Sequence, residues 1–288
     1  MNQQIINIVN NALSEDAARN DITTRILIPD DLKIDAEIIS REKGIACGIS
    51  VAELAFKLLD KNIRFKAMVK DGAIIKKGDV LVKIYGKARS ILSAERTALN
   101  LLAHLSGIAT LTNEFAKKVK PYRTKILDTR KTTPNLRLLE KYAVRCGGGF
   151  NYRFNLSDAI LIKDNHIQAT SRKPQATSLK EIIRKVKEKA KGKKIEIEVE
   201  NLSQFKEALA ASPDIIMLDN FKILDIEKAV KLRKSFFVPR SSCLVKLEAS
   251  GGVSIRNVKK IASTGVDFIS IGALTHSVKS LDLSLEIL

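Results

Sequence analysis

The feature that most constrains the fold of this 288-residue chain is the alternation of short aliphatic segments with helical patterns along its second half. Strands are expected where aliphatic residues cluster, at 126–127, 159–162, 195–199, 215–218, 244–247 and 268–271. Helical spacing of apolar residues occurs between them, at 136–144, 179–191, 205–210, 226–232 and 255–262. This alternation predicts right-handed βαβ units around a parallel sheet, and hence an α/β fold.

The first hundred residues lack this rhythm. Alternating apolar residues and turn signals predict short, largely antiparallel strands within 33–40 and 63–85, and helices are expected over 51–59 and 91–105. Because the two parts of the chain follow different patterns, we expect a domain boundary near Gly107.

Basic residues accompany the first two strands of the second half. Arg130, Lys131 and Lys163 lie at the carboxyl ends of expected strands, and Arg153 lies between those strands. In parallel α/β folds this end of the sheet carries the chemistry. Arginine binds carboxylate or phosphate with two hydrogen bonds, and lysine suits phosphate oxygens. The cluster favours an anionic ligand over ordinary surface charge.

Carboxylates mark the next two strands. Glu196, Glu198 and Glu200 alternate with aliphatic residues, which is typical of a half-exposed strand. The same pattern fits a closed barrel whose glutamates point into the lumen, and periodicity does not choose between the two. Asp219 follows the next strand. Two carboxylates from neighbouring strand ends would suit Mg2+ shared with substrate phosphates.

Small residues follow the last two strands. Ser250 and Gly251 come after one of them, and Gly272 and Ala273 come after the other. Loops at this position, with free backbone amides, form the common phosphate site of barrel folds. The histidines are less informative. His104 and His276 are expected to be structural, whereas His166 could orient a neighbouring lysine.

Composition limits the classes of protein that remain. The chain has 50 Lys and Arg against 32 Asp and Glu, a net charge of +18, which alone would suggest nucleic-acid binding. Its basic residues are interleaved with apolar ones, and aromatics make up only 5%, so we expect no nucleic-acid partner. No apolar run is long enough for a membrane span and no secretory signal is evident, which favours the cytoplasm. The cysteines lack zinc or disulfide spacing and are interpreted as packing residues: Cys47, Cys146 and Cys243.

A series of ordered motifs covers nearly the whole chain: DITT, ERTALNLLAHLSGIAT, DTRKTTP, LEKYAVRCGGG, LIKDNH, LDNF and GALTHS. Together they resemble the quinolinate phosphoribosyltransferase family. The resemblance implies an N-terminal α/β sandwich domain at 1–107, joined by the C-terminal tail 275–288, and an incomplete TIM-like α/β barrel at 108–274. It also implies a homodimer.

The implied reaction belongs to NAD biosynthesis. The phosphoribosyl group of phosphoribosyl pyrophosphate passes to quinolinate, pyrophosphate leaves, and loss of carbon dioxide gives nicotinate mononucleotide. The resemblance implies Mg2+ as cofactor. It assigns the quinolinate carboxylates to Arg96, from the partner subunit, and to Arg130, Arg153 and Lys163. Phosphoribosyl pyrophosphate is assigned to Lys131 and Lys163, the ribose and Mg2+ to Glu198 and Asp219, and the 5-phosphate to Ser250, Gly251, Gly272 and Ala273.

The sequence departs from the family pattern in two places. Tyr152 stands where the family motif has histidine, so the position keeps a hydrogen-bond donor but cannot become cationic near neutral pH. We expect its hydroxyl to support the carboxylate cradle. Asn135 replaces a common glycine. Residues 235–242 form a linker to which no role is assigned.

Three alternatives remain open at this point. A barrel lysine such as Lys163 could act as the nucleophile of a Schiff-base aldolase. The net charge leaves a nucleic-acid binder as a second class. The third is a related phosphoribosyltransferase that acts on another carboxylate acceptor.

Overall fold

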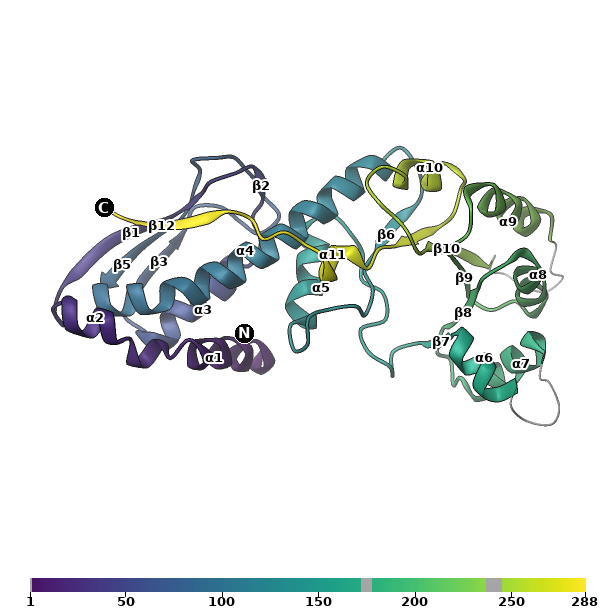
Figure 1. Cartoon of the computed structure of the whole chain (residues 1–288), viewed down its shortest axis with the longest axis horizontal. Helices are drawn as coiled ribbons and strands as arrows, with labels where there is room; N and C mark the ends of the chain where they lie inside the picture. Colours follow the sequence, from purple (N-terminus) through teal and green to yellow (C-terminus); the bar gives the residue numbers. More distant parts are fainter. Residues whose placement is uncertain (1, 172–177, 237–244) are drawn as a thin grey trace. The chain divides into compact units, whose positions relative to one another are not determined.

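The computed structural model describes residues 2–171, 178–236 and 245–288. Two compact units divide the chain. One comprises residues 1–113, 131–149 and 273–288, and the other comprises 114–130 and 150–272. The first is built on antiparallel sheets and the second on a six-stranded parallel sheet, which confirms the expected mixed α/β architecture (Figure 1).

The antiparallel unit is centred on a four-stranded sheet in the order β12-β1-β5-β3. The C-terminal strand β12 lies beside β1 and places Leu285 opposite Ile38 (Figure 1). Helix α3 packs on this sheet, because the Phe56 ring lies 5.9 Å from the Phe65 ring of β3. The strands are β1 (Lys33–Ser40), β2 (Gly44–Ile45), β3 (Arg64–Ala67), β4 (Ile74–Ile75), β5 (Val80–Lys87) and β12 (Leu283–Ile287). The helices are α1 (Gln3–Glu15), η1 (Ala18–Asn20), α2 (Ile22–Leu27), α3 (Ile49–Leu59), α5 (Arg137–Cys146) and α11 (Ala273–His276).

Helix α4 (Ala88–Val119) is much longer than the expected 91–105 and continues through Gly107. The C-terminal segment crosses the helix there. Leu281 N donates a hydrogen bond of 3.0 Å to the Ala103 carbonyl, and a Cβ atom at Gly107 would overlap the Lys279 carbonyl oxygen. The glycine therefore permits a close backbone approach and does not end the helix. Among the described residues, no helix is both long and apolar enough to cross a membrane.

The parallel unit contains all six expected strands, in the order β6-β11-β10-β9-β8-β7. Strands that follow one another from β7 to β11 are neighbours in the sheet, which is the winding of a barrel. Edge strands β6 and β7 are not paired with each other among the described residues, so the barrel is open. The strands are β6 (Lys125–Leu127), β7 (Ile160–Ile162), β8 (Ile195–Val199), β9 (Ile215–Asp219), β10 (Lys246–Ser250) and β11 (Phe268–Ser270). The helices are α6 (Asp164–Ser171), α7 (Leu179–Lys189), α8 (Leu202–Ala211), α9 (Ile223–Ser235) and α10 (Val258–Ser263).

Strand β10 corrects one prediction. A strand was expected over 244–247, with Glu248 in the loop that follows, but β10 runs from Lys246 to Ser250. Pairing with β9 sets this register, because Lys246 lies opposite Ile215 and Ser250 opposite Asp219. Glu248 is consequently inside the sheet and fully buried.

The register divides the parallel sheet into an aliphatic face and a polar face. Residues paired across parallel strands point to the same side. Glu198, Met217 and Glu248 lie opposite one another on adjacent strands and therefore point to the same side of the sheet. Because side chains alternate along a strand, residues two positions before or after each of them point to that side as well. We call this side the polar face. It carries Glu196, Glu198, Asp219, Glu248, Ser250 and Ser270. The opposite side is wholly aliphatic, and helix α8 packs against β8 and β9 (Figure 1).

The burial of β8 decides between a half-exposed strand and a strand whose glutamates point into a barrel. Both sides of β8 are buried, and Glu196 has no exposed surface. The alternation of glutamate and aliphatic residues reflects a barrel interior and not a half-exposed strand. Burial raises the cost of each carboxylate, so these side chains need protons or cationic partners.

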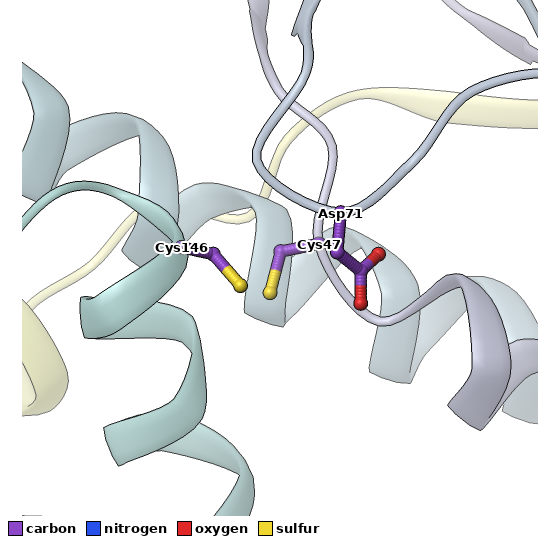
Figure 2. Close-up of side chains that lie close together, drawn as sticks. All are labelled: Cys47, Asp71 and Cys146. Atoms are coloured by element: carbon purple, nitrogen blue, oxygen red, sulfur yellow. The ribbon is translucent and has the colours of Figure 1, made fainter.

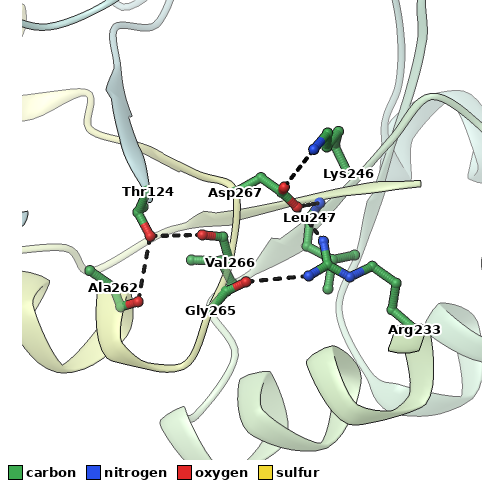
Figure 3. Close-up of polar contacts among 8 residues, drawn as sticks. All are labelled: Thr124, Arg233, Lys246, Leu247, Ala262, Gly265, Val266 and Asp267. Atoms are coloured by element: carbon green, nitrogen blue, oxygen red, sulfur yellow. Dashed lines mark hydrogen bonds and ion pairs between the residues drawn. The ribbon is translucent and has the colours of Figure 1, made fainter. Parts of the chain in front are cut away.

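A polar network joins β10, β11 and α9 at the amino ends of the two strands (Figure 3). Asp267 accepts hydrogen bonds from Leu247 N and Lys246 Nζ, each at 2.9 Å, and pairs with the buried Arg233. Burial alone would raise the pKa of Asp267, but these donors and cations lower it overall. The network fixes the relative register of the last strands.

Candidate active site

An ion pair joins the carboxyl ends of β7 and β8. Lys163 Nζ lies 3.0 Å from Glu198 Oε2. The Lys163 side chain is 46% exposed, whereas that of Glu198 is 11% exposed. An incoming anion can therefore reach the lysine from solvent, while the glutamate stays within the polar face.

His166 holds the backbone at Lys163 and not its amine. Lys163 N donates a hydrogen bond of 3.0 Å to His166 Nδ1, and helix α6 begins at Asp164. The sequence did not predict this helix. The histidine thus helps to fix the turn from strand to helix, which sets the direction in which the lysine side chain leaves the sheet.

The other two histidines make structural contacts, as expected. His104 Nε2 lies 2.8 Å from Glu140 Oε1, and Glu140 in turn accepts a hydrogen bond of 3.1 Å from Thr133 N. His276 Nδ1 lies 2.6 Å from the hydroxyl of Ser277.

Beneath the ion pair lies a buried pair of carboxyl groups. Burial and the neighbouring Glu248 raise the pKa of Glu196 well above its usual range. Burial likewise raises the pKa of Glu248 to about 7, although hydrogen bonds with Ser270 and Glu196 oppose the shift. Two buried carboxyl groups that lie close together cannot both ionise at low cost, which is why both pKa values are raised. Neither Glu248 nor Ser270 was predicted from the sequence to belong to the polar face.

The loop that follows α5 brings Tyr152 and Arg153 to this face. Asp128, after β6, accepts a hydrogen bond of 3.1 Å from Tyr152 N. Burial, followed by the charge of Glu196, raises the pKa of Tyr152. Arg153 is half-buried and adopts a left-handed backbone conformation, with φ of 42°. Arg130 is also half-buried, two residues beyond Asp128.

The loops after β9 and β10 are tightly coupled. Asn220 N donates a hydrogen bond of 2.9 Å to the Ser250 carbonyl. Gly251 has φ of 83°, and a Cβ atom there would overlap the Asn220 amide group. Only glycine satisfies both conditions. The glycine is therefore required for the close packing of these two loops.

Three further predicted site residues, Arg96, Lys131 and Ala273, belong to the antiparallel unit, whereas Gly272 is the last residue of the parallel unit. Lys131 is exposed and its carbonyl accepts a hydrogen bond of 2.6 Å from Thr275 Oγ1. Ala273 opens the short helix α11. Arg96 is exposed on α4. Asn135 has φ of 66°, a left-handed conformation that asparagine tolerates better than most residues, which explains how it replaces a glycine.

Glu198 and Asp219 have the chemistry that Mg2+ requires. They present hard oxygen donors from neighbouring strands on the same face. Asp219 Oδ2 accepts a hydrogen bond of 2.8 Å from Asn220 Nδ2, which limits its rotation. Mg2+ is commonly held by one or two carboxylates plus substrate phosphates, so two carboxylates fit the ion.

Two predictions concern residues that lie partly or wholly outside the described ranges. Cys243 is not described, and the linker over 235–242 is described only at Ser235 and Phe236. Cys47 is buried, in agreement with a packing role, but it lies beside Cys146. The wide separation of these two cysteines in the sequence gave no signal of that contact.

Comparisons with known proteins agree with the motifs. Residues 21–106 match the family model of the quinolinate phosphoribosyl transferase N-terminal domain, and residues 108–286 match that of the C-terminal domain. A probable nicotinate-nucleotide pyrophosphorylase [carboxylating] of Methanocaldococcus jannaschii is 45% identical over 98% of this chain and 96% of its own length. That of Bacillus subtilis is 41% identical over 99% and 93%.

The structural comparison extends the same relationship to the fold. The nicotinate-nucleotide pyrophosphorylase of Francisella tularensis superposes with a TM-score of 0.89 at 42% identity, over 100% of this chain and 97% of that one. The domain models cover nearly all of residues 21–286, and the relatives cover almost the whole chain. The chain belongs to the quinolinate phosphoribosyltransferase family.

Proposed function

We propose that the chain transfers the phosphoribosyl group of phosphoribosyl pyrophosphate to quinolinate and releases pyrophosphate and carbon dioxide. The product is nicotinate mononucleotide, a precursor of NAD. Full-length relatives that carry the name of this activity support the assignment. The observation that carries it furthest in the structure is the Lys163–Glu198 pair, set at strand ends beside Asp219 and Gly251.

Both substrates are anions, and the proposed site offers the guanidinium groups of arginine and the ammonium groups of lysine to bind them. Arg130, Arg153 and Lys163 are assigned to the two carboxylates of quinolinate. Lys131 and Lys163 are assigned to phosphoribosyl pyrophosphate, and the 5-phosphate is assigned to the loops at Ser250, Gly251, Gly272 and Ala273. Guanidinium forks suit carboxylates, and backbone amides of a glycine loop suit a phosphate.

The chemical step needs no nucleophilic residue. The quinolinate nitrogen forms a bond to the anomeric carbon of ribose as the bond to pyrophosphate breaks. The 2-carboxylate is later lost as carbon dioxide, and the electron pair left on C2 takes up a proton from solvent. Positive charge develops on the ribose, which Glu198 and Asp219 can stabilise. Mg2+ held by these two carboxylates would supply charge neutralisation for the departing pyrophosphate. Catalysis consists of positioning and electrostatics.

The buried carboxyl pair gives the floor of this site a defined charge. Because the pKa values of Glu196 and Glu248 are raised, the polar face carries less negative charge near neutral pH than four ionised carboxylates would. A floor with four full negative charges would repel dianionic quinolinate. Glu198 and Asp219 are then the carboxylates left to face the ribose.

We also propose a homodimer in which Arg96 reaches the site of the partner subunit. Arg96 and Asn100 are exposed one helical turn apart on α4, so this face of the helix is open to a second chain. A guanidinium supplied in trans would complete the carboxylate cradle.

The choice of acceptor tests the function directly. The protein is incubated with phosphoribosyl pyrophosphate, Mg2+ and either quinolinate or nicotinate, and mononucleotide formation is followed by chromatography. We expect a rate with quinolinate at least about a hundredfold above that with nicotinate, because the latter lacks one of the two carboxylates that the cations bind. A higher rate with nicotinate would assign the chain to another acceptor. Borohydride trapping of a carbonyl substrate on Lys163 would instead support the aldolase alternative.

A further inference from the structure

A second cluster of reactive side chains lies within the antiparallel unit, separate from the polar face. Sγ of Cys47, Sγ of Cys146 and a carboxylate oxygen of Asp71 all lie within 4.8 Å of one another (Figure 2). They come from three segments. Cys47 precedes α3, Asp71 lies in the turn between β3 and β4, and Cys146 ends α5. In the described ranges, no other group of three histidine, cysteine or acidic side chains is as close.

The carboxylate of Asp71 is held in a fixed orientation. Its Oδ1 accepts hydrogen bonds of 2.9 Å from Gly48 N and 3.0 Å from Ile49 N, at the start of α3. Its Oδ2 accepts one of 2.7 Å from the Tyr142 hydroxyl. Each carboxylate oxygen has two acceptor sites, so Oδ2 retains one for a further partner. Carboxylates that bind metals are commonly oriented by such outer hydrogen bonds.

The two thiols are also held in place. Cys47 N donates a hydrogen bond of 3.0 Å to Ser106 Oγ, and the Cys47 side chain is buried. A hydrogen bond with Cys146, followed by burial, raises the Cys47 pKa, whereas the same hydrogen bond lowers that of Cys146. A cation between the two sulfur atoms would favour ionisation of both thiols.

We propose that Cys47, Asp71 and Cys146 bind a thiophilic divalent cation, with Zn2+ as the expected occupant. Two thiolates and one carboxylate oxygen are ligands that Zn2+ accepts, and a tetrahedral ion would keep its fourth position for water. Cys146 and Asp71 are half-buried, so water can reach that position. Each thiol that binds as a thiolate releases its proton to solvent. The ion would tie the segment before α3 to the end of α5.

The test uses full-length, untagged protein that has been reduced and stripped of metal with a chelator. Titration with Co2+ should produce a thiolate-to-cobalt charge-transfer absorption that saturates at one ion per chain. Zn2+ should abolish this absorption, because it binds thiolate sites more tightly than Co2+ does. Excess Mg2+ should leave it unchanged, since Mg2+ prefers an all-oxygen shell.

Four variants assign the ligands. Cys47→Ser and Cys146→Ser should each remove the absorption. Asp71→Asn keeps an acceptor for the amides before α3 but loses the charge, and we expect Co2+ affinity to fall at least about tenfold. Tyr142→Phe removes only the outer hydrogen bond and should cost about tenfold. Circular dichroism of the metal-free variants establishes that they are folded, and Cys243→Ser is the control expected to bind normally.

Three results would overturn the proposal. The first is the absence of charge-transfer absorption in the parent protein, and the second is absorption that persists when Cys47 and Cys146 are both replaced. The third is a protein that binds no Co2+ but loses two titratable thiols to a Cys47–Cys146 disulfide when treated with the oxidant diamide. The cluster would then be a redox pair and not a metal site.

Discussion

Lys163 Nζ donates a hydrogen bond of 3.0 Å to Glu198 Oε2 across the neighbouring parallel strands β7 and β8. The contact couples a cation that solvent can reach with a carboxylate that is largely enclosed by the sheet. In the proposed reaction the lysine binds substrate anions and the glutamate faces the ribose. Each partner would therefore exchange this contact for one with substrate.

Replacement of Lys163 by alanine should remove a charged contact made in the transition state. We expect a loss of about 3 kcal/mol or more, equivalent to more than about a hundredfold in kcat/KM. The control is Lys185→Ala, whose amine also lies 3.0 Å from a glutamate, Glu181, but on the surface of α7. Steady-state kinetics should place the control within a factor of two of the parent. Activity of Lys163→Ala within a few-fold of the parent would remove the lysine from the site.

Arg96 provides a test of the shared site. Arg96→Ala and Lys163→Ala proteins should each be nearly inactive, since each lacks one cation in every site. After subunit exchange, heterodimers should contain one site with both cations, and about a quarter of the parent activity should return if half of the dimers are mixed. Each variant put through exchange alone is the control. If mass spectrometry shows that subunits have exchanged but the mixture stays as inactive as each single variant, the in-trans role of Arg96 is refuted.

Tyr152 is the residue at which the chain departs from the family motif. If its hydroxyl supports the carboxylate cradle, Tyr152→Phe should weaken quinolinate binding by about 0.5–1.5 kcal/mol, the contribution of one neutral hydrogen bond. Tyr152→His should be tolerated. Both variants are compared by quinolinate titration. Unchanged affinity in Tyr152→Phe with a lower melting temperature would mean that the hydroxyl serves only Glu196 beneath the site.

Asp267 should contribute stability without affecting the reaction. Asp267→Asn leaves the buried guanidinium of Arg233 without its anion, and we expect a loss of about 3 kcal/mol in the free energy of unfolding. Glu181→Gln, at the exposed pair with Lys185, should cost no more than about 0.5 kcal/mol. Urea unfolding measures both. An Asp267→Asn protein as stable as Glu181→Gln would show that the network in Figure 3 contributes little.

The same aspartate predicts a pH dependence. Its pKa in the folded protein lies below the ordinary value of 3.8, so the unfolded chain binds the proton more readily. The stability gained from ionised Asp267 is fully present above the unfolded pKa and is lost as pH falls through the folded one. The difference in stability between the parent and Asp267→Asn should therefore be constant above about pH 5 and shrink below about pH 4.

The sequence predicted the parts of the fold that local patterns determine. Aliphatic runs predicted β7, β8 and β9, and the polar residues that follow two of them predicted Lys163 and Asp219 as site residues. The family resemblance added Glu198. Hydropathy alone does not predict a buried acidic residue within a strand, so Glu248 was placed at the start of a loop. Its burial depends on Glu196 and Ser270 from other strands, which only the sheet brings together.

Long-range contacts set the other limits. The helix expected over 91–105 continues through Gly107, and that glycine allows the C-terminal segment to cross α4. The proximity of Cys47 and Cys146 depends on how α5 packs within its unit, which spacing does not encode. Asn135, in contrast, was recognisable as a glycine substitute, and its positive φ gives the reason.

The central claim is that phosphoribosyl transfer and decarboxylation are coupled at the site containing Lys163. The most direct measurement uses quinolinate labelled in its 2-carboxylate and follows labelled carbon dioxide, pyrophosphate and nicotinate mononucleotide together. We predict equal amounts of all three, formed only when phosphoribosyl pyrophosphate is present and greatly reduced in Lys163→Ala. Release of carbon dioxide without phosphoribosyl pyrophosphate, or formation of a mononucleotide that retains the label, would contradict the account.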